Sequence, residues 1–276
     1  MPLTKSWRPT TFLRFEESFP TSMCTARIVT DAGKAYIKAM GNPQGPHPLA
    51  CELVGTQLAD WFGLPTFEFA LMNVNADVDE ILFFNGNKAD SGPAFVSKAV
   101  NGHNWGGKGK ELDSLVNPEA ISQLIIFDTW TRNCDRYPPD LKLRQPNRDN
   151  VFLEDLGQGS FRLIAMDQSC CFNWGRDLNP KIANIEIVKD ARLYGLFPAF
   201  VPYVRQEVVE KAIEKLNLIN DKIVEKMVNI VPGEWNVDKK TRIEWKEMIC
   251  QRAVFVAETI MGTIAKQCWP GQLFDK

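Results

Sequence analysis

The sequence is poor in histidine and has no regular cysteine pattern. It contains 2 histidines, His47 and His103, so a histidine-rich metal centre is not expected, and a Ser-His-Asp triad would depend on one of two loop-like positions. Its 7 cysteines form no pair of C-x-x-C units, which favours reduced thiols over a disulfide framework or a zinc site. Metal-histidine and disulfide chemistry are therefore both disfavoured.

Long apolar segments and an excess of either charge are also missing. No run approaches the roughly 20 apolar residues that span a bilayer, and the N-terminal MPLTKSWRPTTFLRF lacks the apolar core of a signal peptide. The formal net charge of -2 gives no electrostatic reason to expect nucleic acid. The sequence therefore predicts a cytoplasmic protein that binds no membrane and does not bind nucleic acid directly.

The composition that remains is that of a folded protein, with 45% hydrophobic and 24% charged residues. Its 276 residues suffice for one large domain or for two lobes with a cleft. The first third predicts a helix in LACELVGTQLADWFG and an antiparallel sheet around it. The expected strands lie in TFLRF (11–15), CTARIVT (24–30), KAYIKAM (34–40), PTFEFALMNV (65–74), EILFFN (80–85) and PAFVSKAV (93–100).

From about residue 100 the sequence changes character. The polar NGHNWGGKGKELDSL (101–115) is typical of a connector or exposed loop, and the following helix is expected to use Asn117 as N-cap with Pro118 at its first position. NVFLED and FRLIAMD predict a hairpin, and the segments after residue 200 predict amphipathic scaffold helices. We therefore predict an α+β fold with two lobes, a sheet lobe with one helix at 1–100 and a mainly helical lobe at 101–276.

Five polar residues occur in an order that fits phosphoryl transfer. Such transfer from ATP needs a cation on the phosphates, an acid that positions this cation, a carboxylate beside the acceptor hydroxyl and oxygen ligands for Mg²⁺. Each residue alone is weak evidence, since a lone strand lysine such as Lys38 or a helix glutamate such as Glu52 is more often an ordinary surface charge. Together they offer one candidate for every role: Lys38 on a strand, Glu52 on the next helix, Asp135 after a helix, Asn150 before a strand and Asp167 at the end of the following strand.

Several segments resemble the HipA-like kinases, distant relatives of the protein kinases and the phosphoinositide kinases. The resemblance is carried by YIKA, LACELVGTQLADWFGLPTFEFALMNV, IIFDTWTRNCDR, NVFLED and LIAMDQS, about a third of the chain. It implies a two-lobed protein-kinase-like fold, with a nucleotide-binding sheet in the first lobe and the catalytic loop and metal site in the second. By this match Asp135 is the catalytic aspartate, Asn150 and Asp167 bind the metal, Lys38 binds ATP and Glu52 is its partner.

The resemblance also implies a function. It predicts an ATP- and Mg²⁺-dependent kinase that phosphorylates a hydroxyl, with Ser or Thr of a protein as substrate, and it implies an antitoxin or regulatory partner of the kind that HipA-like toxins often have. A pseudokinase or nucleotide-binding interaction module is an alternative. A kinase-like enzyme that transfers AMP is another.

The sequence departs from the family pattern in three places. Residues 137–149 separate the D-R dipeptide from Asn150, and within them Asn147 is a competing ligand, although Asn150 directly precedes VFL. Gln168 and Ser169 follow the aspartate where the family often has His or Phe and then Gly. The loop EESFPTSMC has no glycine, so it would contact phosphates through Ser18, Thr21 or Ser22, or bind them poorly.

The inserted residues 137–149 invite their own prediction. They are expected to shape or gate the access of the acceptor to Asp135, because they lie where the acceptor would approach. The alternative is a tolerated surface loop, since long loops cost little entropy.

Overall fold

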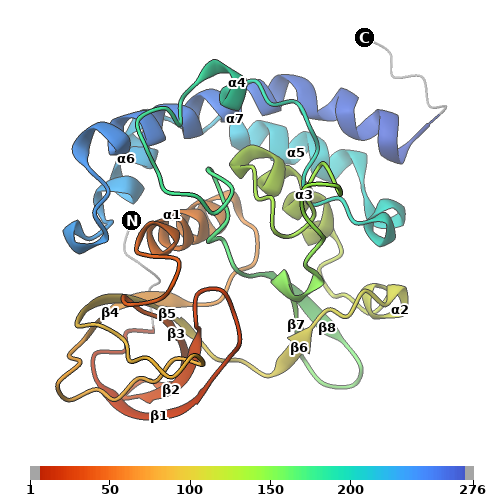
Figure 1. Ribbon diagram of the computed structural model, residues 1–276. Coiled ribbons are helices and arrows are strands. Elements are labelled where there is room, and N and C mark those ends of the chain that lie inside the picture. The colour runs from red at the N-terminus through yellow and green to blue at the C-terminus, as the bar shows by residue number, and fades with distance from the viewer. Residues whose placement is uncertain (1–6, 271–276) are drawn as a thin grey trace.

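The structure is a computed structural model that describes residues 7–270 (Figure 1). Its first part is a five-stranded antiparallel sheet. The strands lie in the order β1-β2-β3-β5-β4. Their bounds are β1 Phe12–Ser18, β2 Ala26–Thr30, β3 Gly33–Lys38, β4 Phe69–Val74 and β5 Gly92–Lys98. Five of the six predicted strands are therefore present with shifted ends.

The predicted strand at 80–85 was wrong. Within residues 7–270, the only ladder contact of this segment is an isolated bridge between Leu82 and Lys88. Ile81 and Phe83 are buried in the apolar cluster of the sheet, and Phe83 N donates to Asn87 O across a tight turn. The apolar residues of the segment thus cover the sheet as a loop, and burial rather than strand pairing explains its hydrophobicity.

Helix α1 (His47–Phe62) joins the sheet to the rest of the molecule. It begins with Pro48 in its first turn and ends at Gly63, whose φ of 91° is the left-handed conformation that glycine adopts at little cost. The helix is buried on nearly all sides, and its apolar residues belong to the same cluster as the C-terminal helices. A polar residue on this helix, such as Glu52, therefore lies inside the molecule.

A second sheet of three antiparallel strands follows, in the order β6-β7-β8. It consists of β6 (Gly102–Asn104), β7 (Val151–Asp155) and β8 (Phe161–Ala165), and the hairpin of β7 and β8 was predicted. The prediction of a plain connector at 101–115 was wrong, because this segment contains β6 and the short helix α2 (Gly109–Leu112). All three residues of β6 are exposed, so the strand is held by backbone pairing and leaves no apolar alternation in the sequence.

Helices make up the remainder and lie above the two sheets in Figure 1. Helix α3 was expected to be capped by Asn117, but the Asn117 amide pairs with the backbone of Leu163 in β8 through contacts of 2.9 and 3.0 Å, and Pro118 takes the N-cap position. Asn117 therefore ties the helix to the hairpin. The helices are α3 Glu119–Thr131, α4 Ile185–Val188, α5 Gln206–Leu216, α6 Asp221–Asn229 and α7 Lys239–Cys268, with short 3-10 turns η1 Arg148–Asn150, η2 Pro198–Tyr203 and η3 Gly233–Trp235.

The long helix α7 is apolar and long enough to cross a membrane by length and composition, which is weak evidence of a span. It packs on α3, where Trp130 Nε1 donates to Ile249 O over 2.9 Å and Arg252 Nε donates to Trp130 O over 2.8 Å. Arg252 is fully buried. These contacts are those of a core helix.

The predicted α+β architecture, with an antiparallel sheet, a single crossing helix and a mainly helical second part, is confirmed. The boundary near residue 100 remains a proposal, placed where the first sheet ends at Lys98 and β6 begins at Gly102.

Candidate active site

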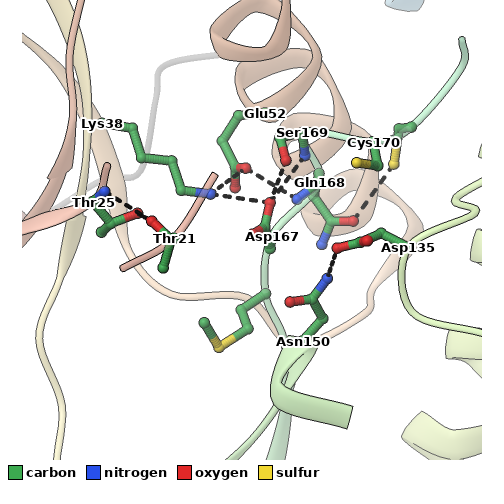
Figure 2. Close-up of polar contacts among 12 residues, drawn as sticks. Thr21, Thr25, Lys38, Glu52, Asp135, Asn150, Asp167, Gln168, Ser169 and Cys170 are labelled. Atoms are coloured by element: carbon green, nitrogen blue, oxygen red, sulfur yellow. Dashed lines mark hydrogen bonds and ion pairs between the residues drawn. The ribbon is translucent and has the colours of Figure 1, made fainter. Parts of the chain in front are cut away.

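Lys38, the last residue of β3, makes two ion pairs inside the molecule (Figure 2). Its Nζ lies 2.7 Å from Glu52 Oε2 on α1 and 3.1 Å from Asp167 Oδ1 after β8. The exposed fractions of the three side chains are 13%, 5% and 21%. One cation therefore links the first sheet, the crossing helix and the hairpin of the second sheet.

Burial and charge act in opposite directions on these groups. Burial alone would lower the pKa of Lys38, but the carboxylates of Asp167 and Glu52 raise it above its ordinary value. Burial alone would raise the pKa of Asp167, but the Lys38 charge and hydrogen bonds from Ser169 lower it to about 2. At Glu52 the effect of burial exceeds the opposing effect of the Lys38 charge, so the pKa of Glu52 is raised. Lys38 is thus held as a cation and Asp167 as an anion at neutral pH.

Asp135 lies in the loop after α3, and one of its carboxylate oxygens accepts hydrogen bonds from two side-chain amides. Its Oδ2 accepts hydrogen bonds from Asn150 Nδ2 over 2.6 Å and from Asn147 Nδ2 over 3.3 Å. The Asn147 oxygen caps the following turn by accepting from Asp149 N, and its amide also donates to Asn150 Oδ1 over 3.1 Å. Asn147 is therefore engaged as a turn cap and positions Asn150, which keeps a free lone pair on its oxygen.

Arg136 fixes the backbone beside both candidate metal ligands. Its wholly buried guanidinium pairs with Asp128 on α3 through Nη1. Its Nε donates to Asn150 O over 3.1 Å, and its Nη2 donates to Met166 O over 2.7 Å. Because Met166 directly precedes Asp167, one side chain sets the distance between the Asn150 and Asp167 segments.

Asp167 itself has a left-handed backbone conformation, with a φ of 59°. The turn is held by Ser169, whose N and Oγ donate to Asp167 Oδ1 over 3.3 and 2.5 Å. Gln168 N donates to Glu52 Oε2 over 3.1 Å, and a Cβ at Gly55 of α1 would lie only 2.6 Å from Gln168 Cβ. The crossing helix thus presses directly on the segment that carries Asp167.

A cavity of about 530 Å³ contains all five of these predicted residues. One part of its wall is charged and polar, around Lys38 and Asp135, and another part is aromatic. Phe67 and Phe152 pack edge to face there, with ring centroids 5.1 Å apart. The cavity therefore combines a surface for a flat apolar group with a surface for anions and cations. Its aromatic lining is Phe19, Tyr36, Phe67, Phe69, Phe95 and Phe152.

The model of the family described as HipA-like kinase matches residues 23–265. The chain belongs to the HipA-like kinase family. The resemblance inferred from short motifs is thereby confirmed over most of the chain, and comparison with curated protein sequences gives no match.

Solved structures of kinase-like proteins share the fold of this HipA-like kinase. The chain is similar to the Helicobacter pylori proinflammatory kinase CtkA, with a TM-score of 0.56 and 12% identity over 95% of this chain and 100% of that chain. It is also similar to hydra Fam20 with sugar, with a TM-score of 0.52 and 11% identity over 95% of this chain and 87% of that chain. At this identity the likeness concerns the fold, which is that of kinase-like phosphotransferases.

The oxygen atoms near Lys38 suit a hard divalent cation. Asp167 Oδ1 is taken by Lys38 and Ser169, whereas Asp167 Oδ2 has no hydrogen-bond partner within residues 7–270. Asn150 Oδ1 retains a lone pair, as described above. The described residues contain no group of three or more His, Cys, Asp or Glu side chains that could hold a metal. Mg²⁺ commonly uses one or two protein oxygens together with waters and substrate phosphates, so the residues fit this ion.

The loop between β1 and β2 closes on itself without glycine. Thr21 Oγ1 accepts from Thr25 N over 2.9 Å, and Phe19 N donates to Thr25 O over 2.9 Å. Of the predicted contact residues, Ser22 and Thr21 line the cavity. Ser18 pairs with Ala26 at the end of β1 and is not part of the lining found in the described structure. Ser22 is therefore the better placed of the two serines.

Sequence reasoning missed two parts of this site. The Asp128 partner of Arg136 could have been noticed, because it is a charged residue within an otherwise apolar helical run. Arg144 could not, because its contact with Asp135 depends on how an irregular loop folds back.

Proposed function

We propose that the chain is an ATP- and Mg²⁺-dependent kinase that transfers the γ-phosphoryl group to a hydroxyl, with Ser or Thr of a protein as the acceptor. The observation that carries the proposal is one cavity that holds both the Lys38, Glu52 and Asp167 ion network and the Asp135 and Asn150 pair. Family membership supports the use of ATP. The acceptor class rests on the family resemblance.

The proposed role of each side chain follows from its charge. Lys38 binds phosphate oxygens, and Glu52 holds the ammonium in place from the buried side. Asp135 orients the acceptor hydroxyl and accepts its proton, since an ionised carboxylate offers only acceptor sites. Asn150 and Asp167 would hold Mg²⁺, which neutralises charge on the phosphates when bound. The aromatic wall excludes water and is suited to the base of the nucleotide.

The first test compares wild type with Asp135→Asn and Asp167→Asn. Asparagine is used because it tolerates the left-handed conformation at residue 167 better than alanine does. Each variant is expected to lower the transfer rate by about 10²-fold or more, since each removes a charge at the reacting groups. Glu258→Gln, an exposed position on α7, is the matched carboxylate control. Intact mass of the product distinguishes phosphoryl from AMP transfer, and equal rates in all four proteins would refute the proposal.

A second candidate, a nucleotide-binding module without transfer, is favoured by the glycine-free loop. Its Thr21 hydroxyl is already bonded within the loop, so the loop offers fewer groups to phosphates than a glycine-rich one. Calorimetry with Mg-ATP separates the two functions. Tight binding without turnover would favour the module, and efficient transfer would eliminate it.

A further inference from the structure

The inserted residues 137–149 fold back so that the Arg144 side chain contacts Asp135. Arg144 Nη2 is hydrogen-bonded to Asp135 Oδ1, and the guanidinium also contacts two thiols, with 3.5 Å from Nη1 to Cys134 Sγ and 3.5 Å from Nη2 to Cys170 Sγ. The end of the insertion is anchored by Asn147 N, which donates to Asp135 O over 3.2 Å. Arg144 lines the same cavity as Lys38, and its side chain is 37% exposed. A bound molecule can therefore reach it.

The lone pairs of Asp135 determine where a hydroxyl can bind. A carboxylate oxygen accepts about two hydrogen bonds. Oδ2 already receives the amides of Asn150 and Asn147. Oδ1 receives Arg144 and keeps one position. An acceptor hydroxyl that uses Asp135 as its base is consequently directed to Oδ1, next to the Arg144 guanidinium.

The charges of the cavity distinguish Arg144 from Lys38. Lys38 is paired with two carboxylates, Glu52 and Asp167, whereas Arg144 is paired with one. A guanidinium has five N–H donors, and the three contacts that Arg144 makes within residues 7–270 use at most three of them. Arg144 therefore keeps both donors and charge for an anion beside the acceptor hydroxyl. Its planar fork matches phosphate oxygens.

We propose that Arg144 is a further catalytic residue, whose guanidinium contacts the phosphoryl group while it is transferred. This inference rests on the proposed kinase function. The acceptor oxygen forms the new bond to the γ-phosphorus and gives its proton to Asp135 Oδ1. The bond from the γ-phosphorus to the bridging oxygen breaks, and its electron pair stays on the β-phosphate of ADP. Arg144 keeps its proton and stabilises the charge on the moving group.

The decisive experiment measures binding of a phosphoryl mimic to Arg144→Ala, Arg144→Lys and Lys142→Ala. Lys142 is an exposed cation of the same insertion and serves as the control. Calorimetry compares Mg-ADP alone with Mg-ADP plus aluminium fluoride. We expect Mg-ADP to bind all four proteins alike, and aluminium fluoride to tighten binding in wild type and Lys142→Ala. In Arg144→Ala we expect this gain to fall by about 10²-fold, with partial retention in Arg144→Lys.

The outcomes separate this inference from the function on which it rests. Absence of Mg-ADP binding in wild type would refute both. Mg-ADP binding that aluminium fluoride does not tighten in wild type, or tightens equally in Arg144→Ala, would refute the role of Arg144 alone. Weaker binding of Mg-ADP itself in Arg144→Ala would also refute it, since that indicates a structural role.

A kinetic measurement excludes a role in acceptor recognition. With dephosphorylated casein as the acceptor, Arg144→Ala is expected to lower kcat by about 10²-fold with little change in the KM for casein. A raised KM with unchanged kcat would overturn the inference and assign Arg144 to acceptor binding.

Discussion

Two buried side chains, Arg136 and Asp128, fix the positions of backbone segments at the site. Arg136 is paired with Asp128 and donates to the backbone at Asn150 and Met166, so it positions the segments that carry the proposed metal ligands Asn150 and Asp167. Both members of the pair are wholly buried. Removing one partner leaves an uncompensated charge in the interior, which costs more than an exposed ion pair contributes.

We therefore expect Arg136→Ala to lower the free energy of unfolding by about 3–5 kcal/mol. Urea denaturation measures this loss. Arg136→Lys keeps the charge opposite Asp128 but lacks the planar fork by which three nitrogens of Arg136 reach Asp128 and both carbonyls, so it should recover more stability than transfer activity. If Arg136→Lys restored activity fully, the positioning role would be wrong.

The lowered pKa of Asp167 predicts a pH dependence of stability. Its pKa falls from an ordinary 3.8 to about 2 in the folded protein. The ionised carboxylate thus contributes stability that is complete above its unfolded value and is lost as pH falls toward 2. The difference corresponds to about 2 kcal/mol. Asp167→Asn should therefore lose about 2 kcal/mol less than wild type in urea denaturation between pH 5 and pH 2, and identical losses would contradict the assignment.

Helix α1 contacts the site directly, through Glu52 and through Gly55. Alanine usually stabilises a helix interior relative to glycine by about 1 kcal/mol. At Gly55 the opposite is expected, because the added Cβ would lie 2.6 Å from Gln168 Cβ and push the Asp167 segment away from Lys38. Gly55→Ala should lower both the melting temperature and the transfer rate.

Gly262 on α7 provides the matched control. A Cβ at this position meets nothing within 4 Å. Gly262→Ala should therefore raise the melting temperature slightly and leave transfer unchanged. A Gly55→Ala protein that behaved like Gly262→Ala would show that α1 does not set the position of Asp167.

Elements with a clear apolar pattern were predictable from the sequence, and elements held by other forces were not. The buried alternation of β2 and the strong amphipathicity of α5 and α6 identify those elements locally. β6 depends on backbone pairing with a strand about 50 residues later, and the segment around Phe83 is apolar because it covers a core. Long-range partners of this kind leave no local periodicity.

The residues of the candidate site also divide into those that were predictable from the sequence and those that were not. Lys38, Glu52 and Asp167 were found because their order along the chain matches a known family, and the structure brings them into contact. Arg144 was not found, because no regular element fixes the path of the insertion and a single loop arginine is unremarkable in sequence. Deleting residues 139–146 would remove Arg144 as well, so point variants are needed to separate catalysis from control of acceptor access.

At the scale of the whole molecule, within residues 7–270, the two sheets and the helical part line a cavity to which both halves contribute. Lys38 and Glu52 come from before residue 100, whereas Asp135, Asn150 and Asp167 come from after it. A ligand that binds between them should stabilise the folded state by mass action. A cytoplasmic location and an antitoxin or regulatory partner remain predictions from the sequence and the family resemblance.

We therefore expect Mg-ATP to raise the melting temperature of wild type and not that of Lys38→Ala. Lys38→Ala removes the cation that joins the two halves and the charge that would meet the phosphates. Differential scanning fluorimetry with and without Mg-ATP measures the shift, and Lys142→Ala controls for loss of an exposed positive charge. An equal shift in Lys38→Ala would place the nucleotide elsewhere.

The central claim is tested most directly by transfer of label from γ-³²P-ATP in the presence of Mg²⁺. Wild type and Glu258→Gln should incorporate label into a protein acceptor or into themselves, and Asp135→Asn and Asp167→Asn should not. Incorporation of label by Asp135→Asn and Asp167→Asn at the level of wild type would contradict the account. So would the absence of label in all four proteins under conditions in which wild type binds Mg-ATP.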